Sequence, residues 1–334
     1  MTAPAETPPP AGGTTSASEA APAPWFADVA PGPAPESRWL RAADGVRLRV
    51  AHWPEGTRGT VLLFPGRTEH VEKYAPLAEA FTGAGWQVAA IDWRGQGLAD
   101  RLAPDPLLGH VDRFPDYQRD VAALTAFLAR RGAPRPWHLL AHSMGGMIAL
   151  RALHDGLPVT GVVFSAPMWD LPGPGAFALA LKWAIRAADA LGLSLLRTPT
   201  TGPRSYVLTA PFADNTLTRD REMWDWMGRM IRAHPELEIG GASIRWVAEA
   251  LREAALFARL DPPPQPAVTF LGSDEQVVDP VAVRRHMARW GAARPGARLI
   301  EVPAARHEIF MELPPVRQHF IATAIDTFAR AEEG

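Results

Sequence analysis

The 334-residue sequence contains no cysteine and only two lysines, Lys73 and Lys182. The absence of cysteine excludes disulfide bonds, thiolate metal ligands and a cysteine nucleophile. The formal net charge is −2, so no positive field favours nucleic acid as a partner. Hydrophobic residues make up 47% of the chain and charged residues 21%, which is typical of an ordinary globular protein.

The sequence also lacks a long uncharged hydrophobic run. Its most apolar stretch, 175–196, is interrupted by Lys182, Arg186 and Asp189, whereas a membrane span needs about 20 predominantly apolar residues. The N-terminal residues show neither the basic region nor the apolar core of a secretory signal. We therefore expect a cytoplasmic protein whose contact with membranes is peripheral and transient.

Three regions differ in composition and pattern. Residues 1–36 are rich in proline, alanine, serine and threonine, and such a segment buries too little surface to offset the entropy lost on ordering. We expect it to be a disordered tail, in which Trp25 and Phe26 could dock locally. Residues 37–167 and 260–334 are expected to form one core, and 168–259 a helical cap (lid).

Within the expected core, an alternating pattern around a turn at 43–45 predicts a β-hairpin. Short, almost wholly apolar segments then predict strands at 60–64, 87–92, 137–142, 159–165, 267–272 and 297–303. Amphipathic segments between them predict helices at 74–81, 117–131, 144–154, 280–290 and 314–330. This alternation predicts an α/β protein with a mostly parallel central sheet, flanked by helices on both faces.

The most informative segment is the transition from strand to helix around Ser143. The sequence reads Ala141-His142-Ser143-Met144-Gly145, which fits a nucleophile elbow with alanine at the first small position. A sharp turn of this kind exposes the serine hydroxyl above the sheet edge. We expect Ser143 to be a nucleophile, although a small-residue turn without chemistry would have the same pattern.

A serine needs a base to take its proton, and in this chain order the base follows the last strand. His307 lies four residues after the apolar strand that ends at Pro303, in a position where a loop could bring its imidazole over Ser143. His286 and His319 lie within predicted helices and are expected to be structural. His307 is therefore the predicted general base.

An acid is expected just after the strand 267–272, because that strand ends at the same sheet edge. Three carboxylates follow it: Asp274, Glu275 and Asp279. Either type of acid can orient an imidazole, so the residues alone do not choose among them. Those not chosen would be solvated turn acids or, at Asp279, an N-cap of the helix that starts with Pro280.

An oxyanion hole needs two N–H donors, one from the residue after the nucleophile and one from the loop after an early strand. Met144 supplies the first. The sequence Pro65-Gly66-Arg67 follows the strand 60–64, and Gly66 would allow the close turn that directs the Arg67 amide towards the site. A simple strand-ending turn would have the same sequence.

Several motifs in order resemble the monoacylglycerol lipase and bacterial lysophospholipase-like branch of the α/β-hydrolases: FPGRTEHVEKY, IDWRGQG, AHSMGG, FSAPM, GSDEQVVDP and RHEIFME. The chain departs from many members at Pro65, Gln96 and Ala141, and these departures suit the lysophospholipase-like members better. The resemblance implies the α/β-hydrolase fold and the triad Ser143, His307 and Glu275, with Asp274 as the alternative acid. It implies an acyl-enzyme and no metal or organic cofactor.

The resemblance implies a small lipid or ester substrate, with lysophospholipids or related monoacyl lipids preferred. The cap would line an acyl-chain pocket, and its edge would touch membrane surfaces. Three alternatives stay open: a monoacylglycerol lipase, a general carboxylesterase or thioesterase, and a hydrolase-like binding module without catalysis.

Overall fold

The computed structural model describes residues 20–173, 176–199 and 201–333. In this part of the chain, eight strands form one sheet in the order β1-β2-β4-β3-β5-β6-β7-β8. The strands are β1 (Glu36–Arg41), β2 (Arg47–Trp53), β3 (Thr60–Phe64), β4 (Gln87–Asp92), β5 (Trp137–His142), β6 (Val162–Ser165), β7 (Ala267–Gly272) and β8 (Arg298–Val302). The pairs β1–β2 and β2–β4 are antiparallel, and all other pairs are parallel. The prediction of a mostly parallel sheet is confirmed.

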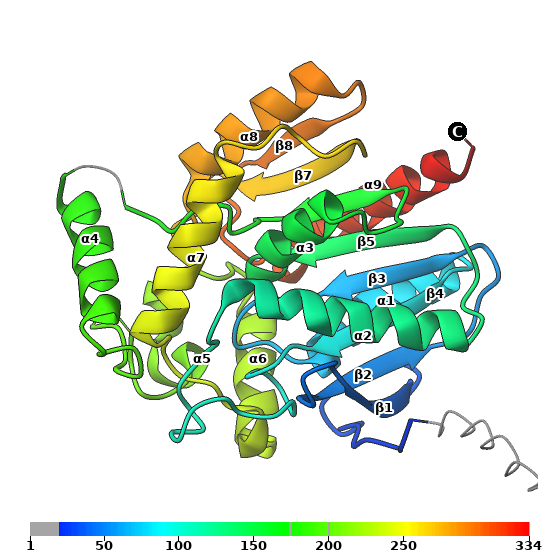
Figure 1. Ribbon diagram of the computed structural model, residues 1–334. Helices are drawn as coiled ribbons and strands as arrows, with labels where there is room; N and C mark the ends of the chain where they lie inside the picture. Colours follow the sequence, from blue (N-terminus) through cyan, green and yellow to red (C-terminus); the bar gives the residue numbers. More distant parts are fainter. Residues whose placement is uncertain (1–19, 174–175, 200, 334) are drawn as a thin grey trace, which may run out of the picture.

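Helices cover both faces of this sheet (Figure 1). α1 (Ala75–Gly83) and α9 (Pro314–Glu333) contact each other on one face. The other face carries α2 (Tyr117–Arg130), α3 (Met144–His154) and α8 (Pro280–Ala293).

The alternation of side chains along each strand separates two hydrophobic cores. In β3, Val61 and Leu63 pack in the cluster that contains α1 and α9 residues, whereas Leu62 and Phe64 pack in the cluster on the α3 side. All four side chains are fully buried. Burial of both faces explains why these strands have continuous apolar sequences rather than an alternating polar pattern.

The segment between β6 and β7 is helical. It contains α4 (Ala176–Ala190), α5 (Tyr206–Thr209), α6 (Arg221–Ala233) and α7 (Ile244–Phe257), and none of its described residues belongs to a strand of the sheet. Figure 1 shows these helices beyond the carboxyl ends of the parallel strands. Ligands of parallel α/β sheets bind at this edge.

The predicted limit of the N-terminal tail is wrong for residues 20–36. The Trp39 amide donates to Ala21 O at 2.8 Å, and the Ala23 amide donates to Ser37 O at 3.0 Å, so the chain pairs with β1 before the predicted core begins. Trp25 packs edge-on against Trp53, with ring centroids 5.6 Å apart. Paired backbone groups and the packing of the partly buried Trp25 ring therefore offset the ordering entropy here. The remainder of the predicted tail, 1–19, lies outside the described residues.

Among the described residues, no helix has both the length and the apolar character required to traverse a bilayer.

Candidate active site

Ser143 occupies a sharp turn between β5 and α3. Its backbone angles are φ 50° and ψ −118°, an unusual conformation for a residue with a side chain. The turn is held by its neighbours: the Ser143 amide donates to Ser165 O at 3.1 Å, and Ser143 O accepts from the Met168 amide at 2.9 Å. The strained residue is thus fixed by hydrogen bonds to the next strand and the loop that follows it.

The two glycines after Met144 are required by close packing. A Cβ atom at Gly145 would lie 2.1 Å from Phe64 O, and one at Gly146 would lie 2.5 Å from the Cβ of Pro167. Ala141 is fully buried in the sheet, so the alanine at the first small position of the elbow is accommodated. Met144 is buried and begins α3, whose N-terminus favours negative charge nearby.

The structure brings Glu275, and not Asp274, to His307. His307 Nδ1 lies 2.8 Å from Glu275 Oε2, and both residues are buried. Glu275 Oε1 accepts from the amides of Val277 and Val278 at 2.6 and 3.1 Å, which fixes the carboxylate.

Burial on its own would raise the pKa of the Glu275 carboxyl, but the adjacent imidazole and the two amides outweigh it and hold this pKa below its usual value. The carboxylate form is therefore favoured opposite His307. The other two candidate acids lie elsewhere: Asp274 is exposed, and Asp279 accepts from the first amides of α8 as its N-cap. The carboxylate can therefore hold the imidazole in one tautomer, with Nε2 available to a substrate or hydroxyl.

The loop carrying His307 is anchored by the helical insertion. The Glu308 amide donates to Leu217 O at 2.8 Å. The buried side chain of Glu312 accepts from the amides of Arg306 and Arg219 at 2.9 and 3.2 Å. Sequence reasoning missed Glu312, because its partners are separated from it by up to 93 residues.

Ser143 and His307 both line a cavity of about 530 Å³ between the sheet edge and the helical insertion. Its apolar wall includes Met168, Leu171, Leu181, Ile185, Val247 and Leu251. The volume lies within the range of sites that take small organic molecules or lipid chains.

Gly66 and Arg67, from the loop after β3, also line this cavity. The amides on either side of Arg67 have side-chain acceptors, since Gly66 N–H donates to Glu69 and Thr68 N–H donates to Gln96 Oε1 at 2.7 Å. Thr68 has a φ of 63°, so the chain turns sharply here. Gln96, which lies after β4, thus links its loop to the loop after β3.

A buried charged cluster, which we call the Glu69 cluster (Glu69, Lys73, His142 and Glu308), lies beside the catalytic candidates. Lys73 Nζ lies 2.5 Å from Glu69 Oε1 and 2.7 Å from Glu308 Oε1. His142 Nε2 lies 3.3 Å from Glu308 Oε2. The sequence did not lead us to predict this cluster. Two of its features are nevertheless present in the sequence: Glu69 and Lys73 are four residues apart, and Glu308 follows His307 directly.

The charges of the Glu69 cluster support one another. Burial would lower the pKa of the Lys73 ammonium, but Glu308 and Glu69 outweigh it and raise this pKa. Burial likewise opposes the charge on His142, and the same two carboxylates outweigh it and raise the pKa of the imidazole. The candidate ligand atoms of Glu69, His142 and Glu308 lie within 4.8 Å of one another, a spacing that could hold a metal ion. The ammonium of Lys73 already supplies positive charge between the two carboxylates.

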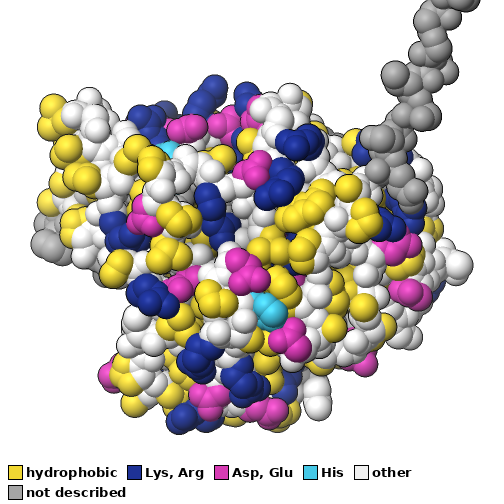
Figure 2. All heavy atoms as spheres, turned by 90° about the horizontal axis from the view of Figure 1, so that it is seen from below, with side chains coloured by type: hydrophobic (Ala, Val, Ile, Leu, Met, Phe, Trp, Pro, Cys, Tyr) yellow, Lys and Arg dark blue, Asp and Glu magenta, His cyan; other side chains and the backbone are white. Residues whose placement is uncertain are grey.

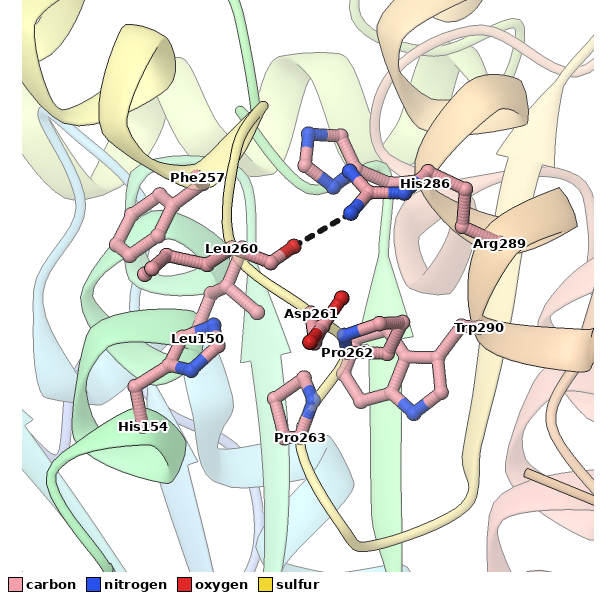
Figure 3. A pocket seen from close by; sticks show the side chains of 10 residues that line it. All are labelled: Leu150, His154, Phe257, Leu260, Asp261, Pro262, Pro263, His286, Arg289 and Trp290. Carbon is pink, nitrogen blue, oxygen red and sulfur yellow. Dashed lines mark hydrogen bonds between the residues drawn. The ribbon is translucent and has the colours of Figure 1, made fainter. Parts of the chain in front are cut away.

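A second, much smaller pocket of about 10 Å³ lies between α3, α8 and the segment after α7 (Figure 3). None of the predicted site residues lines it. Arg289 donates to Leu260 O at 2.7 Å and fixes this segment. Burial lowers the pKa of His286 to about 4, so this imidazole is neutral near pH 7, as suits a packing residue.

The comparisons with known proteins agree with this geometry. Residues 55–314 match the family described as "Serine aminopeptidase, S33". The chain belongs to this family of serine hydrolases. The resemblance to lysophospholipase-like α/β-hydrolases, and with it the expectation of an enzyme, is confirmed.

Two curated relatives cover most of this S33 hydrolase. This chain is 32% identical over 303 residues to lysophospholipase L2 of Escherichia coli K12, and the match covers 85% of this chain and 83% of that protein. It is 29% identical over 296 residues to the probable lysophospholipase L2 of Haemophilus influenzae, covering 85% and 89%.

Among solved structures, a soluble variant of monoglyceride lipase from Saccharomyces cerevisiae superposes with a TM-score of 0.71 at 20% identity, covering 90% of this chain and 96% of that one. This similarity confirms the α/β-hydrolase fold.

Proposed function

We propose that this S33 hydrolase is a lysophospholipase that cleaves the acyl ester of monoacyl phospholipids. The observation that carries the proposal is that His307, paired with Glu275, lines the same cavity as Ser143, and that this cavity has an extensive apolar wall. The similarity to two lysophospholipase L2 proteins over most of their length supports the substrate class.

In the proposed reaction, His307 removes the proton of Ser143, whose oxygen attacks the ester carbonyl. The amides of Arg67 and Met144 stabilise the oxyanion. His307 then protonates the leaving oxygen of the glycerophospho head group, which departs as an alcohol, and the acyl group remains on Ser143 as an ester. Water, deprotonated by His307, releases the fatty acid and restores the serine. Glu275 holds the imidazole tautomer and stabilises its charged form.

The helical insertion, 168–259, acts as a cap in this proposal. Its residues Leu181, Ile185 and Leu251 contribute to the apolar wall of the cavity, and α4 packs on α7 through the contact of Ile185 with the cluster that includes Ile244. A cap of this kind encloses the acyl chain and excludes water from all but the reacting end.

The outer side of the cap is the proposed membrane contact. Of the eight exposed large hydrophobic side chains in the described part, five lie on α4 and the segment after it: Trp183, Leu191, Leu193, Leu195 and Leu196. Figure 2 shows hydrophobic side chains at the end of the molecule where α4 lies. An exposed patch of large apolar side chains is suited to transient contact with lipid aggregates.

The test is the release of fatty acid from lysophosphatidylethanolamine, from a monoacylglycerol with the same acyl chain and from p-nitrophenyl esters of increasing length. We expect kcat/KM to be highest for the lysophospholipid and to vanish in Ser143→Ala. Higher values for the monoacylglycerol would instead identify a monoacylglycerol lipase, and a preference for short esters would identify a carboxylesterase. Absence of hydrolysis of every ester by the folded wild type would contradict an enzymatic function.

A further inference from the structure

The cavity contains a positive charge that the chain does not neutralise. Three lysine and arginine side chains, Arg67, Lys182 and Arg204, line it among the described residues. Lys182 pairs with Asp170 at 2.8 Å, and Arg204 pairs with Glu238 at 2.6 Å. Arg67 forms no ion pair with any carboxylate of the described chain, and its one hydrogen bond there is from Nη1 to Gly240 O at 2.8 Å.

The Arg67 guanidinium lies deep in the protein. Its carbon is 5.7 Å from the ring centroid of Trp246. The side chain packs close to Gly109, since a Cβ there would lie 3.1 Å from Arg67 Nη1. The side chain nevertheless retains some accessible surface, since it lines the cavity. The other nitrogens of the guanidinium have no acceptor in the described part of the chain, so a ligand in the cavity is their available partner.

The electrostatic environment supports this interpretation. Burial lowers the pKa of Arg67 to about 10, and the positive charge of Arg197 acts on it in the same direction. The side chain still carries its charge at pH 7. Burying a charge without a counter-charge costs several kcal/mol, and such uncompensated groups concentrate at functional sites.

We propose that the Arg67 side chain is the subsite for the phosphate group of the substrate, and so sets the preference for phosphate-bearing over neutral monoacyl glycerides. The planar guanidinium offers parallel N–H donors that match two phosphate oxygens. Arg67 is then a specificity residue in two ways: its amide faces the ester oxyanion, and its side chain faces the head group. This inference rests on the proposed lysophospholipase function and adds the residue that distinguishes the substrate classes.

The first test compares kcat/KM for a lysophospholipid with that for a monoacylglycerol of the same chain length. Both lipids are used at concentrations at which they are dissolved as single molecules and form no micelles. Arg67→Gln keeps a donor for Gly240 O but removes the charge. We expect the lysophospholipid-to-monoacylglycerol ratio to fall at least about tenfold, mainly through KM, because a charge-assisted hydrogen bond is lost. Arg67→Lys should give an intermediate ratio.

The matched control is Arg197→Gln. Arg197 is a nearby cation that pairs with Asp105 at 2.7 Å and does not belong to the lining of the cavity. Its substitution should change the ratio by less than about twofold, as for a surface ion pair. An unchanged ratio in Arg67→Gln, or an equal fall in Arg197→Gln, would overturn the proposal.

A second measurement needs only the wild-type protein and remains valid if the Arg67 variants fail to fold. The labelling rate of Ser143 by a fluorophosphonate is measured with sn-glycerol 3-phosphate, with inorganic phosphate and with glycerol. We expect glycerol 3-phosphate to slow labelling at concentrations at which glycerol has no effect, and free phosphate to protect less. Equal effects of glycerol and glycerol 3-phosphate would refute the phosphate subsite. This result can be read even if lysophospholipids prove not to be substrates, so the two proposals fail separately.

Discussion

Two histidines lie side by side at the floor of the cavity, with ring centroids 4.8 Å apart, yet their surroundings differ. His307 has one carboxylate partner, Glu275, at Nδ1. His142 lies 3.0 Å from Ser165 O through Nδ1, and its Nε2 faces both Glu308 and Glu69 at 3.3 and 3.6 Å.

The difference between the two imidazoles is chemical. With Nδ1 donating to a carbonyl, a neutral His142 would present a lone pair to two carboxylates, so protonation at Nε2 is favoured. His307 has its carboxylate on one side only and can exchange a proton on the other. The placement of the carboxylates, and not proximity to the serine, therefore makes His307 able to exchange a proton and keeps His142 positively charged.

The largest expected effect separates the two histidines directly. Replacing the general base removes proton transfer in every step, so His307→Gln should lower kcat by about 10⁶-fold. His142→Gln should lower kcat by less than about 10²-fold, because this side chain acts through its neighbours. Steady-state hydrolysis of a p-nitrophenyl ester measures both. Equal losses would contradict the division of roles.

The next effect tests the carboxylate of His307. Glu275→Gln would hold the imidazole in the wrong tautomer and should lower kcat on the order of 10³- to 10⁴-fold, with KM little altered. The neighbouring exposed acid is the control. Asp274→Asn should change kcat by less than about twofold, and a large loss there with a mild loss in Glu275→Gln would reverse the assignment.

The sequence alone predicts some of these site residues better than others. Ser143 and His307 were located by their positions after strands, because the ends of parallel strands meet at one edge. Adjacent carboxylates in one turn point in different directions, so choosing Glu275 over Asp274 required the resemblance, and the geometry agrees with that choice. The Glu69 cluster depends on contacts such as Lys73 to Glu308, which are 235 residues apart, and no local pattern encodes them.

In the fold, too, some features follow from the local sequence and others depend on long-range contacts. Short apolar strands and amphipathic helices were predicted close to their observed bounds, since both reflect local periodicity. The ordered structure of residues 20–35 was not predicted, because it depends on pairing with β1 and on the packing of Trp25 against Trp53. Which face of each cap helix meets the cavity also depends on long-range packing.

A third prediction concerns stability rather than catalysis. Lys73→Met leaves Glu69 and Glu308 buried without their shared cation, and breaking such a pair costs about 3–5 kcal/mol of unfolding free energy. Urea unfolding followed by circular dichroism measures this loss. Lys182→Met, which removes a partly exposed ion pair with Asp170, is the control and should cost less than about 1 kcal/mol. Similar losses in both would show that the Glu69 cluster is not a special stabilising feature.

The smallest expected effect is the pH dependence of stability that His142 contributes. Its folded-state pKa is raised, so its contribution is fully present below the unfolded value of about 6.5 and is lost as the pH rises through the folded value. As the pH rises above about 6.5, the wild-type unfolding free energy should therefore fall by more than that of His142→Gln. Parallel curves for the two proteins would rule out the raised pKa.

The most direct test is to determine which residue a fluorophosphonate labels and how strongly the labelling rate depends on His307. Wild-type protein is treated with a fluorophosphonate, digested, and analysed by mass spectrometry. The account predicts a single adduct on Ser143, none in Ser143→Ala, and labelling slowed at least about 10³-fold in His307→Gln. An adduct on another residue, or equal labelling rates with and without His307, would contradict it.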